Sequence, residues 1–503
     1  MSHKMAKSRA QWGNALTRAA VLSVLIAAPA AYAPPSSAQP AVAVYPATGG
    51  PPWRTLPEAA TFPFKDLRKE LANKTTGTFT VTSVGDMFWK MPVSKRMSPQ
   101  LRELMQKADT TVGNLEGGAG WDPDSSGNAL AELGVDLLAP GEFDGGWEGF
   151  QTSVEAMGKH GIKIAGAGAN LDASRRPQFH ETAQGRIALV SACPADNLCG
   201  PRATPARPGV NPLGMTIWNV VTAEQFNQLS GIQASILARR GEPPAVAFSA
   251  DPPPLPAGRL MFMGQRYMIG DKPGGLHYEP DPIDEQSQVL AIRNAKELSD
   301  FVIFHMHDHL NPSTFQQYSH SNYPADYLRP FIHKLIDNGL DMYVGTGVHT
   351  IQGIEIYKGR PIFYNQGNLG VDLLRGLNSQ VSPEGMTATE LGERRTNWVW
   401  QADNTVAYMA NTTYKDGRLT EVRIYPVDIG LGSRPWSREQ IPMTPSPAMA
   451  RTILEQLQKF SEPYGTKIAI ENNIGIIRVP PEETAEIGGD LVIPGRRMNG
   501  PAR

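Results

Sequence analysis

The chain has 503 residues, of which 41% are hydrophobic and 19% are charged, and its formal net charge is −2. This composition is typical of a globular protein and is too apolar for wholesale disorder. A mildly acidic chain lacks the concentrated basic surface that nucleic-acid binding requires, so nucleic acid is excluded as a partner.

The N-terminus has the features of an export signal. Four basic residues precede an apolar, alanine-rich run over residues 19–31, and small residues suited to cleavage follow. We therefore predict a signal peptide over residues 1–38, with an uncleaved anchor as the alternative. Either form implies an exported protein that works in the periplasm or at the cell surface.

The first predicted strands end in polar residues. Residues 39–78 begin with a Pro- and Ala-rich stretch, which indicates a linker and lead-in. The alternating run FTVTSVGDMF then predicts a strand that reaches Asp86. After a helix expected over residues 98–108, the short strand TTVGNLEGG brings Asn114 and Glu116 to its end.

The next part of the chain repeats this pattern of strand and helix. A strand expected at residues 135–138 leads into a glycine-rich turn that carries Glu142 and Asp144, and the following helix ends at Gly161. A further buried strand is expected at residues 186–191. Each unit again ends in polar residues.

A long insertion follows this region. Residues 194–282 are Pro-rich and are expected to be irregular apart from one helix, which is typical of a lid, a binding loop or a mobile segment. Cys193 and Cys199, the two cysteines of the chain, lie at its start. In an exported protein this pair favours a small loop-closing disulfide over a metal or redox site.

A strand–helix–strand pattern spans residues 301–369. Its first strand is apolar and leads into His305, His307 and His309, which alternation places on one face. His305 fits a hydrogen-bonded core position as well as it fits a metal ligand. These imidazoles stand where the strand turns polar, as the carboxylates do in the earlier strands.

The second half of the pattern ends in another histidine. An amphipathic helix, with apolar residues from Leu328 to Ile336 and a stop at Asn338-Gly339, precedes a buried strand at residues 340–344, which continues into GTGVH and His349. The carboxyl ends of parallel strands meet in one crevice, so His349 is expected near the earlier polar residues. From residue 401 onward the pattern indicates a β-hairpin, a final helix and a polar tail.

The polar residues at the strand ends form a candidate metal site. They are Asp86, Glu116, Asp144, His307, His309 and His349. Carboxylates with imidazoles suit one or two ions of Mn, Fe or Zn, which would bind an anionic group and activate water. Each position alone also fits a turn or a helix cap, and His320 fits either an exposed loop or a substrate contact.

Repeated βα units followed by β structure predict an α/β sandwich with an additional C-terminal antiparallel β part. The ordered segments VGDMF, NLEGG, AGAG, HMHDH, GTGVH, GIEIYKGRPIFYNQGNL and EVRIYPV resemble the CapA family of poly-γ-glutamate capsule biosynthesis proteins, over about residues 79–474. The resemblance implies a fold similar to the calcineurin-like metallophosphoesterases. We expect its main domain at residues 79–400, completed by residues 401–503.

The resemblance also implies roles for individual residues. Asp86, Glu116, His307 and His349 match metal-site positions of the family. We assign Asp144 and His309 as catalytic candidates. The substrate-binding candidates are Asn114, Glu142, His320 and Asn368.

Two family motifs are altered in this chain. APGEFDGG stands where the family has an ANNH-like motif, so Asp144 keeps only its trailing part and Glu142 is a substitute oxygen ligand. Thr346 stands where a GHxPH-like motif has its first histidine. In the superfamily the missing groups bridge metals and protonate leaving groups, so we expect a partly depleted site.

Three functions remain open at this point. The first is an exported accessory protein that acts with a membrane-bound synthesis complex on an anionic polymer such as poly-γ-glutamate. The second is an active metal-dependent hydrolase of a phosphoester or a polymer, with a bound hydroxide as nucleophile. The third is a non-enzymatic module in which the Pro-rich insertion grips a ligand.

Overall fold

A computed structural model describes most of the chain after residue 66. The described residues are 67–88, 93–116, 122–141, 146–194, 199–240, 255–312, 321–371, 406–430 and 441–481. The chain divides into two units, Met1–Phe64 and Lys65–Arg503, and the description below concerns the second. The predicted signal peptide and most of the linker at residues 39–78 lie outside the described residues.

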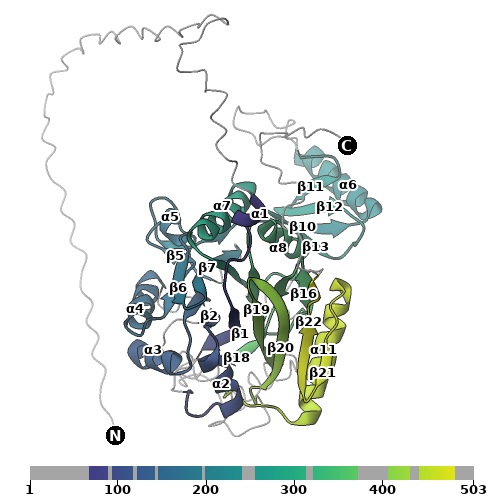
Figure 1. The fold of residues 1–503 in the computed structure, drawn as a ribbon. Coiled ribbons are helices and arrows are strands. Elements are labelled where there is room, and N and C mark those ends of the chain that lie inside the picture. The colour runs from purple at the N-terminus through teal and green to yellow at the C-terminus, as the bar shows by residue number, and fades with distance from the viewer. Residues whose placement is uncertain are drawn as a thin grey trace, which may run out of the picture. The chain divides into compact units, whose positions relative to one another are not determined.

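Two large β-sheets form the centre of this unit (Figure 1). The first has the strand order β21-β22-β20-β19-β1-β2-β3-β4, with β18 paired to β1. The bounds are β1 Thr78–Phe88, β2 Thr110–Leu115, β3 Leu137–Pro140, β4 Lys163–Ile164, β18 Asn368–Val371, β19 Val406–Lys415, β20 Arg418–Asp428, β21 Ala469–Glu471 and β22 Ile474–Arg478. Strands β1 to β4 and β18 are parallel, and β19 begins the antiparallel part.

The second sheet has the order β16-β17-β15-β14-β7-β6, with β9 paired to β7. The bounds are β6 Gln178–Thr182, β7 Gly185–Pro194, β9 Pro212–Leu213, β14 Phe301–Asp308, β15 Met342–Gly347, β16 Ile354–Tyr357 and β17 Arg360–Phe363. Its central strands β7, β14, β15 and β17 are parallel, whereas β6 and β16 pair antiparallel at the edges. Parallel strands buried on both faces are nearly continuous apolar runs, as β14 is.

Helices cover the outer faces of the two sheets. α2 (Pro99–Lys107), α3 (Pro123–Glu132) and α4 (Gly146–Lys159) pack on the first sheet, and α7 (Pro282–Leu298) and α8 (Leu328–Ile336) pack on the second. The inner core joins residues of both sheets, for example Phe79, Val112, Leu189 and Ile303, all buried. α11 (Pro447–Ser461) also contributes to it. The predicted class, an α/β sandwich with an antiparallel C-terminal part, is confirmed.

The predicted insertion at residues 194–282 contains more structure than expected. In its described part, β10 Met215–Val221, β11 Arg259–Phe262, β12 Gln265–Ile269 and β13 Leu276–Pro280 form a four-stranded sheet that α6 (Ala223–Arg240) accompanies. The one helix predicted here is observed as α6, whereas the prediction that the rest of the segment is irregular is wrong. Most positions in these strands are only half-buried, so they lack the apolar runs by which we identified the other strands.

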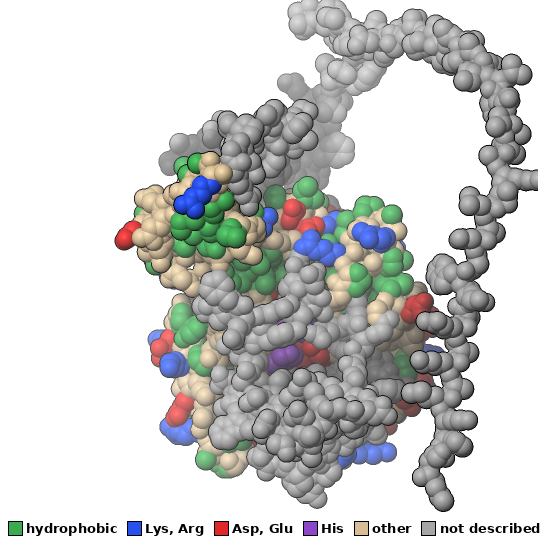
Figure 2. All heavy atoms as spheres, turned by 180° about the vertical axis from the view of Figure 1, so that it is seen from behind, with side chains coloured by type: hydrophobic (Ala, Val, Ile, Leu, Met, Phe, Trp, Pro, Cys, Tyr) green, Lys and Arg blue, Asp and Glu red, His purple; other side chains and the backbone are tan. Residues whose placement is uncertain are grey.

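We call α6 and β10 to β13 the lobe. Apolar side chains gather on its surface in Figure 2, and Met263 is 82% exposed. Ile232 and Leu237 of α6 are also exposed, whereas Trp218 inside the lobe is buried and donates its indole N–H to Glu279 at 2.9 Å. Among the described residues, no helix combines the length and apolarity needed to cross a membrane.

Several smaller elements also differ from expectation. The predicted polar tail contains β21 and β22, which form a hairpin at the edge of the first sheet. α3 was not predicted, although Asp122 caps it by accepting from the backbone N–H of Ser125. Short elements complete the described part: α1 Leu67–Glu70, α5 Leu171–Ser174, β5 Ala167–Gly168, β8 Gly209–Val210 and the 3-10 helix Glu462–Tyr464.

Candidate metal centre

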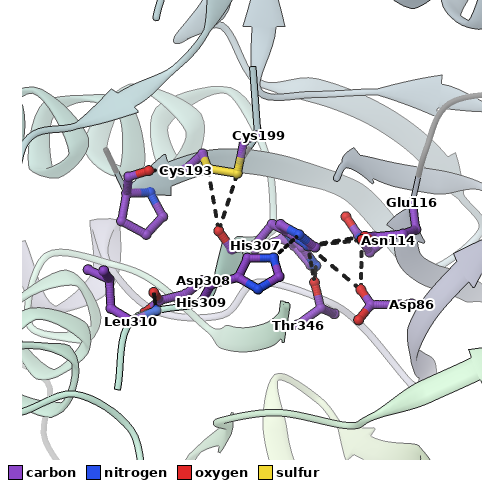
Figure 3. Close-up of a disulfide and its surroundings, with 12 residues drawn as sticks. Asp86, Asn114, Glu116, Cys193, Cys199, His307, Asp308, His309, Leu310 and Thr346 are labelled. Carbon is purple, nitrogen blue, oxygen red and sulfur yellow. Dashed lines mark hydrogen bonds and ion pairs between the residues drawn. A yellow bond between two sulfur atoms is a disulfide. The ribbon is translucent and has the colours of Figure 1, made fainter. Parts of the chain in front are cut away.

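The carboxyl ends of strands from both sheets bring the candidate residues together (Figure 3). In the first sheet, the register pairs Asp86 of β1 with Asn114 of β2 on one side and with Asn368 of β18 on the other. In the second sheet, His307 of β14 pairs with Thr346 of β15. Residues that lie up to 282 positions apart in sequence therefore share one region of the molecule.

An irregularity in β1 gives Asp86 its orientation. Val84 and Met87 both pack in the outer apolar cluster, although strict alternation would place residues three apart on opposite faces. The register of β1 shifts between Ser83 and Asp86 and again between Asp86 and Met87. Such a bulge redirects a side chain, and here the Asp86 carboxylate contacts Asn114 and His307 on the inner side.

Asp86, Glu116 and His307 form the group that offers metal ligands. One ligand atom from each lies within 4.8 Å of the others. Nδ1 of His307 is 3.7 Å from Oδ1 of Asp86 and 3.4 Å from Oε2 of Glu116. All three residues are at most 3% exposed, so both carboxylates have lost almost all contact with water.

The side-chain amide of Asn114 lies at the centre of this group. Its Nδ2 atom is 2.7 Å from Asp86 Oδ1, 2.8 Å from Glu116 Oε2 and 3.1 Å from His307 Nδ1. The close packing requires glycine at position 141, because a Cβ there would lie 2.8 Å from the same Nδ2. Asn114 was predicted to contact substrate; the structure places it fully buried among the metal-ligand candidates.

Three histidines extend along β14 and beyond it. Nε2 of His309 is 2.9 Å from Nε2 of His307, and the Thr346 hydroxyl lies 3.1 Å from His307 Nδ1 and 3.3 Å from His305 Nε2. Burial lowers the pKa of His305 to about 3 and that of His307 to about 4, although the Asp86 charge opposes both shifts. Both imidazoles are therefore neutral at pH 7, as metal binding requires.

His349 reaches Asp86 from the loop after β15. Its Nδ1 is 3.4 Å from Asp86 Oδ2 and 2.9 Å from Oδ1 of Asn368, and the backbone N–H of Gly347 donates to Asp86 Oδ2 at 3.3 Å. His349 has a φ of +58°, a left-handed conformation that is uncommon for a non-glycine residue and is often found at functional sites. Burial alone raises the pKa of Asp86, but the bond to His349 and the nearby imidazoles bring it below its ordinary value.

The two cysteines are joined by a disulfide beside this centre. Both sulfur atoms lie 3.5 Å from the backbone oxygen of His307, as Figure 3 shows. A disulfide has no S–H to donate, so these are packing contacts. The disulfide therefore packs directly against the strand that carries the histidines.

Three predicted site residues, Glu142, Asp144 and His320, lie outside the described residues. His309 and Asn368 lie at the centre described above, at 6% and 0% exposure. Thr346, which stands where the family motif has a histidine, and His305, which fitted either a core position or a ligand, also contact the centre through the Thr346 hydroxyl.

The residues present fit a divalent cation. The Asn114 amide has two N–H hydrogens for three acceptors, and the acceptors include two buried carboxylates, so the centre is rich in lone pairs and poor in positive charge. Two carboxylate oxygens and one imidazole nitrogen are ligands that Mn, Fe or Zn accept. Within the described part of the chain this is one candidate group.

Comparisons with known proteins place the chain among capsule synthesis proteins. The family described as bacterial capsule synthesis protein PGA_cap matches residues 80–372. A Sinorhizobium fredii protein named only as uncharacterized is 31% identical over 469 residues, which cover 82% of this chain and 96% of that protein. A probable polyglutamine synthesis accessory protein of Mycobacterium tuberculosis is 28% identical, over 48% of this chain and 45% of its own length.

A shorter match joins the chain to the PGA biosynthesis protein CapA of Bacillus subtilis, with 33% identity over 18% of this chain and 22% of that protein. Among solved structures, a hypothetical protein from Thermus thermophilus has a TM-score of 0.34 at 12% identity, over 70% of this chain and 99% of its own. A putative 5'-nucleotidase from Staphylococcus aureus also has a TM-score of 0.34, at 8% identity, over 76% and 58% of the two chains. By its match over residues 80–372 and its 31% identity to a relative across most of both chains, the protein belongs to the PGA_cap (CapA) family of bacterial capsule synthesis proteins.

Proposed function

We propose that this protein acts in the biosynthesis of an anionic capsule polymer of the poly-γ-glutamate type, and that it does so with a divalent metal ion bound at the described centre. Family membership and the named relatives support the capsule role. The observation that carries the metal part is the buried group of Asp86, Glu116 and His307, whose ligand atoms all lie within 4.8 Å of one another.

Each residue has a task in this proposal. Asp86, Glu116 and His307 would hold the ion, and the bound ion would supply a positive charge that attracts carboxylates or phosphates and lowers the pKa of bound water. His309, whose Nε2 is 2.9 Å from His307 Nε2, would orient His307 and exchange a proton at that atom. Thr346 supports His307 and His305 through its hydroxyl, at a position where the family has a further histidine.

The altered motifs favour an accessory role over rapid hydrolysis. Thr346 is a poorer ligand than the histidine it replaces, so the described centre has fewer strong donors. We propose that the exported protein acts beside a membrane-bound synthesis complex, and that the metal centre recognises the carboxylates of the growing polymer. An active metal-dependent hydrolase is the second candidate, and the position of His309 next to the metal-ligand candidates favours it.

Two measurements on the purified chain test the proposal. Metal content after purification without chelator should show bound metal, and binding of poly-γ-glutamate should be stronger with Mn²⁺ than with EDTA. The matched control is Glu116→Gln, which keeps the shape of the side chain and removes its charge. If the affinity for poly-γ-glutamate is the same with Mn²⁺, with EDTA and in Glu116→Gln, the metal-dependent role is wrong.

The hydrolase candidate is tested in the same preparation. Release of product from poly-γ-glutamate or from a generic phosphoester should then depend on Mn²⁺ and fall with His309→Ala. If the chain binds the polymer in a metal-dependent way but releases no product, the accessory role stands and the hydrolase candidate is rejected.

A further inference from the structure

The side-chain amide of Asn114 lies next to all three candidate ligand atoms. Its Nδ2 is within 3.1 Å of the three atoms that would bind the ion. Metal binding through His307 Nδ1 requires the lone pair of that nitrogen, and a neutral imidazole has one such lone pair. An Asn114 N–H directed at Nδ1 and a metal ion on Nδ1 therefore exclude each other.

The other end of the same amide has no hydrogen-bond partner. Oδ1 of Asn114 is buried, and within the described residues it accepts no hydrogen bond. A buried unsatisfied carbonyl oxygen costs about 1–3 kcal/mol, so such an atom calls for an explanation. Its own nitrogen has the opposite problem, because two N–H hydrogens face three acceptors.

One rotation gives the amide oxygen a partner once a cation is present. Amide oxygen and nitrogen are similar in size, so a half-turn of the amide exchanges their positions with little change in packing. The oxygen would then face the two carboxylates and His307, an arrangement that is repulsive without a cation. With a cation it is favourable, because an amide oxygen is a good ligand for Mg, Ca and Mn.

The observed spacing agrees with this arrangement. Ligand atoms roughly 2.1 Å from one ion in octahedral geometry lie about 3 Å from each other. The amide group of Asn114 is 2.7, 2.8 and 3.1 Å from the three donor atoms, which is the spacing of neighbouring ligands. Asn114 is thus already placed at a ligand position and needs only to turn.

We propose that Asn114 is the fourth protein ligand, with its amide nitrogen holding the metal-free centre together and its amide oxygen binding the ion. The inference rests on the proposed metal site. It adds a statement about which metal binds, because three oxygen ligands and one nitrogen ligand favour a hard ion such as Mn²⁺ over Zn²⁺. The same side chain stabilises both states of the centre.

The test compares Mn²⁺ binding by titration calorimetry in four forms of the purified chain. Asn114→Ala should bind Mn²⁺ about 10- to 100-fold more weakly than the wild type, as loss of a residue around a metal site typically does. Asn114→Asp supplies a carboxylate oxygen without an amide nitrogen. It should keep or strengthen Mn²⁺ binding, yet unfold at lower urea concentration in the absence of metal.

Asn211→Ala is the matched control. Asn211 is also a fully buried asparagine, bonded through its amide to Ser191 and Gln288, and it has no described contact with the three donor atoms. This variant should lose stability and keep the Mn²⁺ affinity of the wild type. A difference between Asn114→Ala and Asn211→Ala then separates a ligand from a merely structural residue.

Each contrary outcome has its own meaning. If the wild type binds no Mn²⁺, the proposed metal site itself fails, and this inference fails with it. If the wild type binds Mn²⁺ and Asn114→Ala binds it equally or more tightly, the amide only competes with the ion, and the ligand assignment alone is wrong. If Asn114→Ala does not fold, the Mn²⁺ affinity of Asn114→Asp tests the assignment instead. Loss of Mn²⁺ binding in Asn114→Asp would overturn the assignment of Asn114 as a ligand.

Discussion

Two buried charged clusters at opposite ends of the same strands show how differently carboxylates can be stabilised. Asp341, just before β15, accepts from Lys296 Nζ at 2.5 Å and from the backbone N–H of Val302 at 2.9 Å, and Arg360 lies 3.4 Å away. At the other end of β14 and β15, Asp86 and Glu116 face an amide and neutral imidazoles. The first cluster pairs its carboxylate with lysine and arginine, and the second brings two carboxylates and an imidazole nitrogen together as candidate metal ligands.

This difference in surroundings distinguishes a carboxylate that stabilises the fold from carboxylates that could bind a metal ion. A buried carboxylate is stable when cations and N–H donors of the chain surround it, as they do at Asp341. Asp86 and Glu116 are instead buried together with His307, with ligand atoms within 4.8 Å of one another, and such a set of oxygen and nitrogen donors suits a divalent cation. We therefore interpret the Asp341 cluster as structural and the Asp86 cluster as a metal centre.

The largest expected effect comes from the structural cluster. Asp341→Asn leaves Lys296 and Arg360 buried without their counter-charge, so it should cost about 3–5 kcal/mol of unfolding free energy. Urea unfolding measures this loss, and added Mn²⁺ should not restore it. A loss below about 1 kcal/mol would contradict the structural interpretation of this cluster.

The metal centre should respond in the opposite way. Glu116→Gln keeps the shape of the side chain and removes one of two carboxylates that are buried close together, so the metal-free protein should keep most of its stability. The variant should lose the stabilisation that Mn²⁺ gives the wild type, which is about 2.7 kcal/mol at a concentration of 100 times Kd. Thermal unfolding with and without Mn²⁺ measures both quantities, and an undiminished Mn²⁺ effect would remove Glu116 from the ligand set.

Another buried carboxylate, that of Glu355, extends the structural side of the comparison to pH dependence. Burial alone raises its pKa, but hydrogen bonds from His333, Arg329 and Tyr364 bring the pKa down to about 2, from an ordinary 4.5. Because the folded pKa is the lower one, this contribution to stability is fully present above pH 4.5 and is lost as the pH falls toward 2.

Glu355→Gln should therefore be less stable than the wild type at pH 7, by on the order of 2 kcal/mol, since Arg329 is half exposed and the ion pair is partly screened. The difference should shrink at pH 3. Urea unfolding at pH 7 and pH 3 measures the difference in unfolding free energy between the two proteins. A difference that is larger at pH 3 than at pH 7 would contradict the lowered pKa of Glu355.

The smallest effect is expected at the disulfide. The double variant Cys193→Ser/Cys199→Ser opens a loop with a sequence separation of six residues, and so short a loop should be worth about 1–2 kcal/mol. Mn²⁺ affinity should change only a few-fold, because β7 and β15 still hold β14 on both sides. Loss of Mn²⁺ binding would instead show that the disulfide positions His307.

Local patterns predicted most of the architecture. The predicted amphipathic helix is observed at residues 328–336, and its buried residues Leu328, Phe331 and Leu335 show the spacing that predicted it. The strand beginning at Phe301 and the hairpin turn at residues 415–417 also agree with expectation. Hydrophobic periodicity and turn residues depend on positions only a few residues apart. A single segment of the sequence is therefore enough to predict these elements.

Other elements could not be predicted in this way. β10 pairs with β12 in parallel across α6, and the half-buried residues of both strands show no clear alternation. The hairpin at residues 469–478 was assigned to a polar tail because its strands are short and partly exposed. These elements depend on pairing partners elsewhere in the chain, and a local pattern does not show such partners.

The sequence by itself determined the α/β class, the family motifs and the placement of carboxylates and histidines at the ends of strands, because each of these depends on local order along the chain. Only the tertiary structure decided which of those side chains meet. The bulge that turns Asp86 inward and the position of Asn114 among three ligand atoms arise where β1, β2 and β14 converge. Such contacts depend on the register between distant strands, and that register is set by the packing of the whole core.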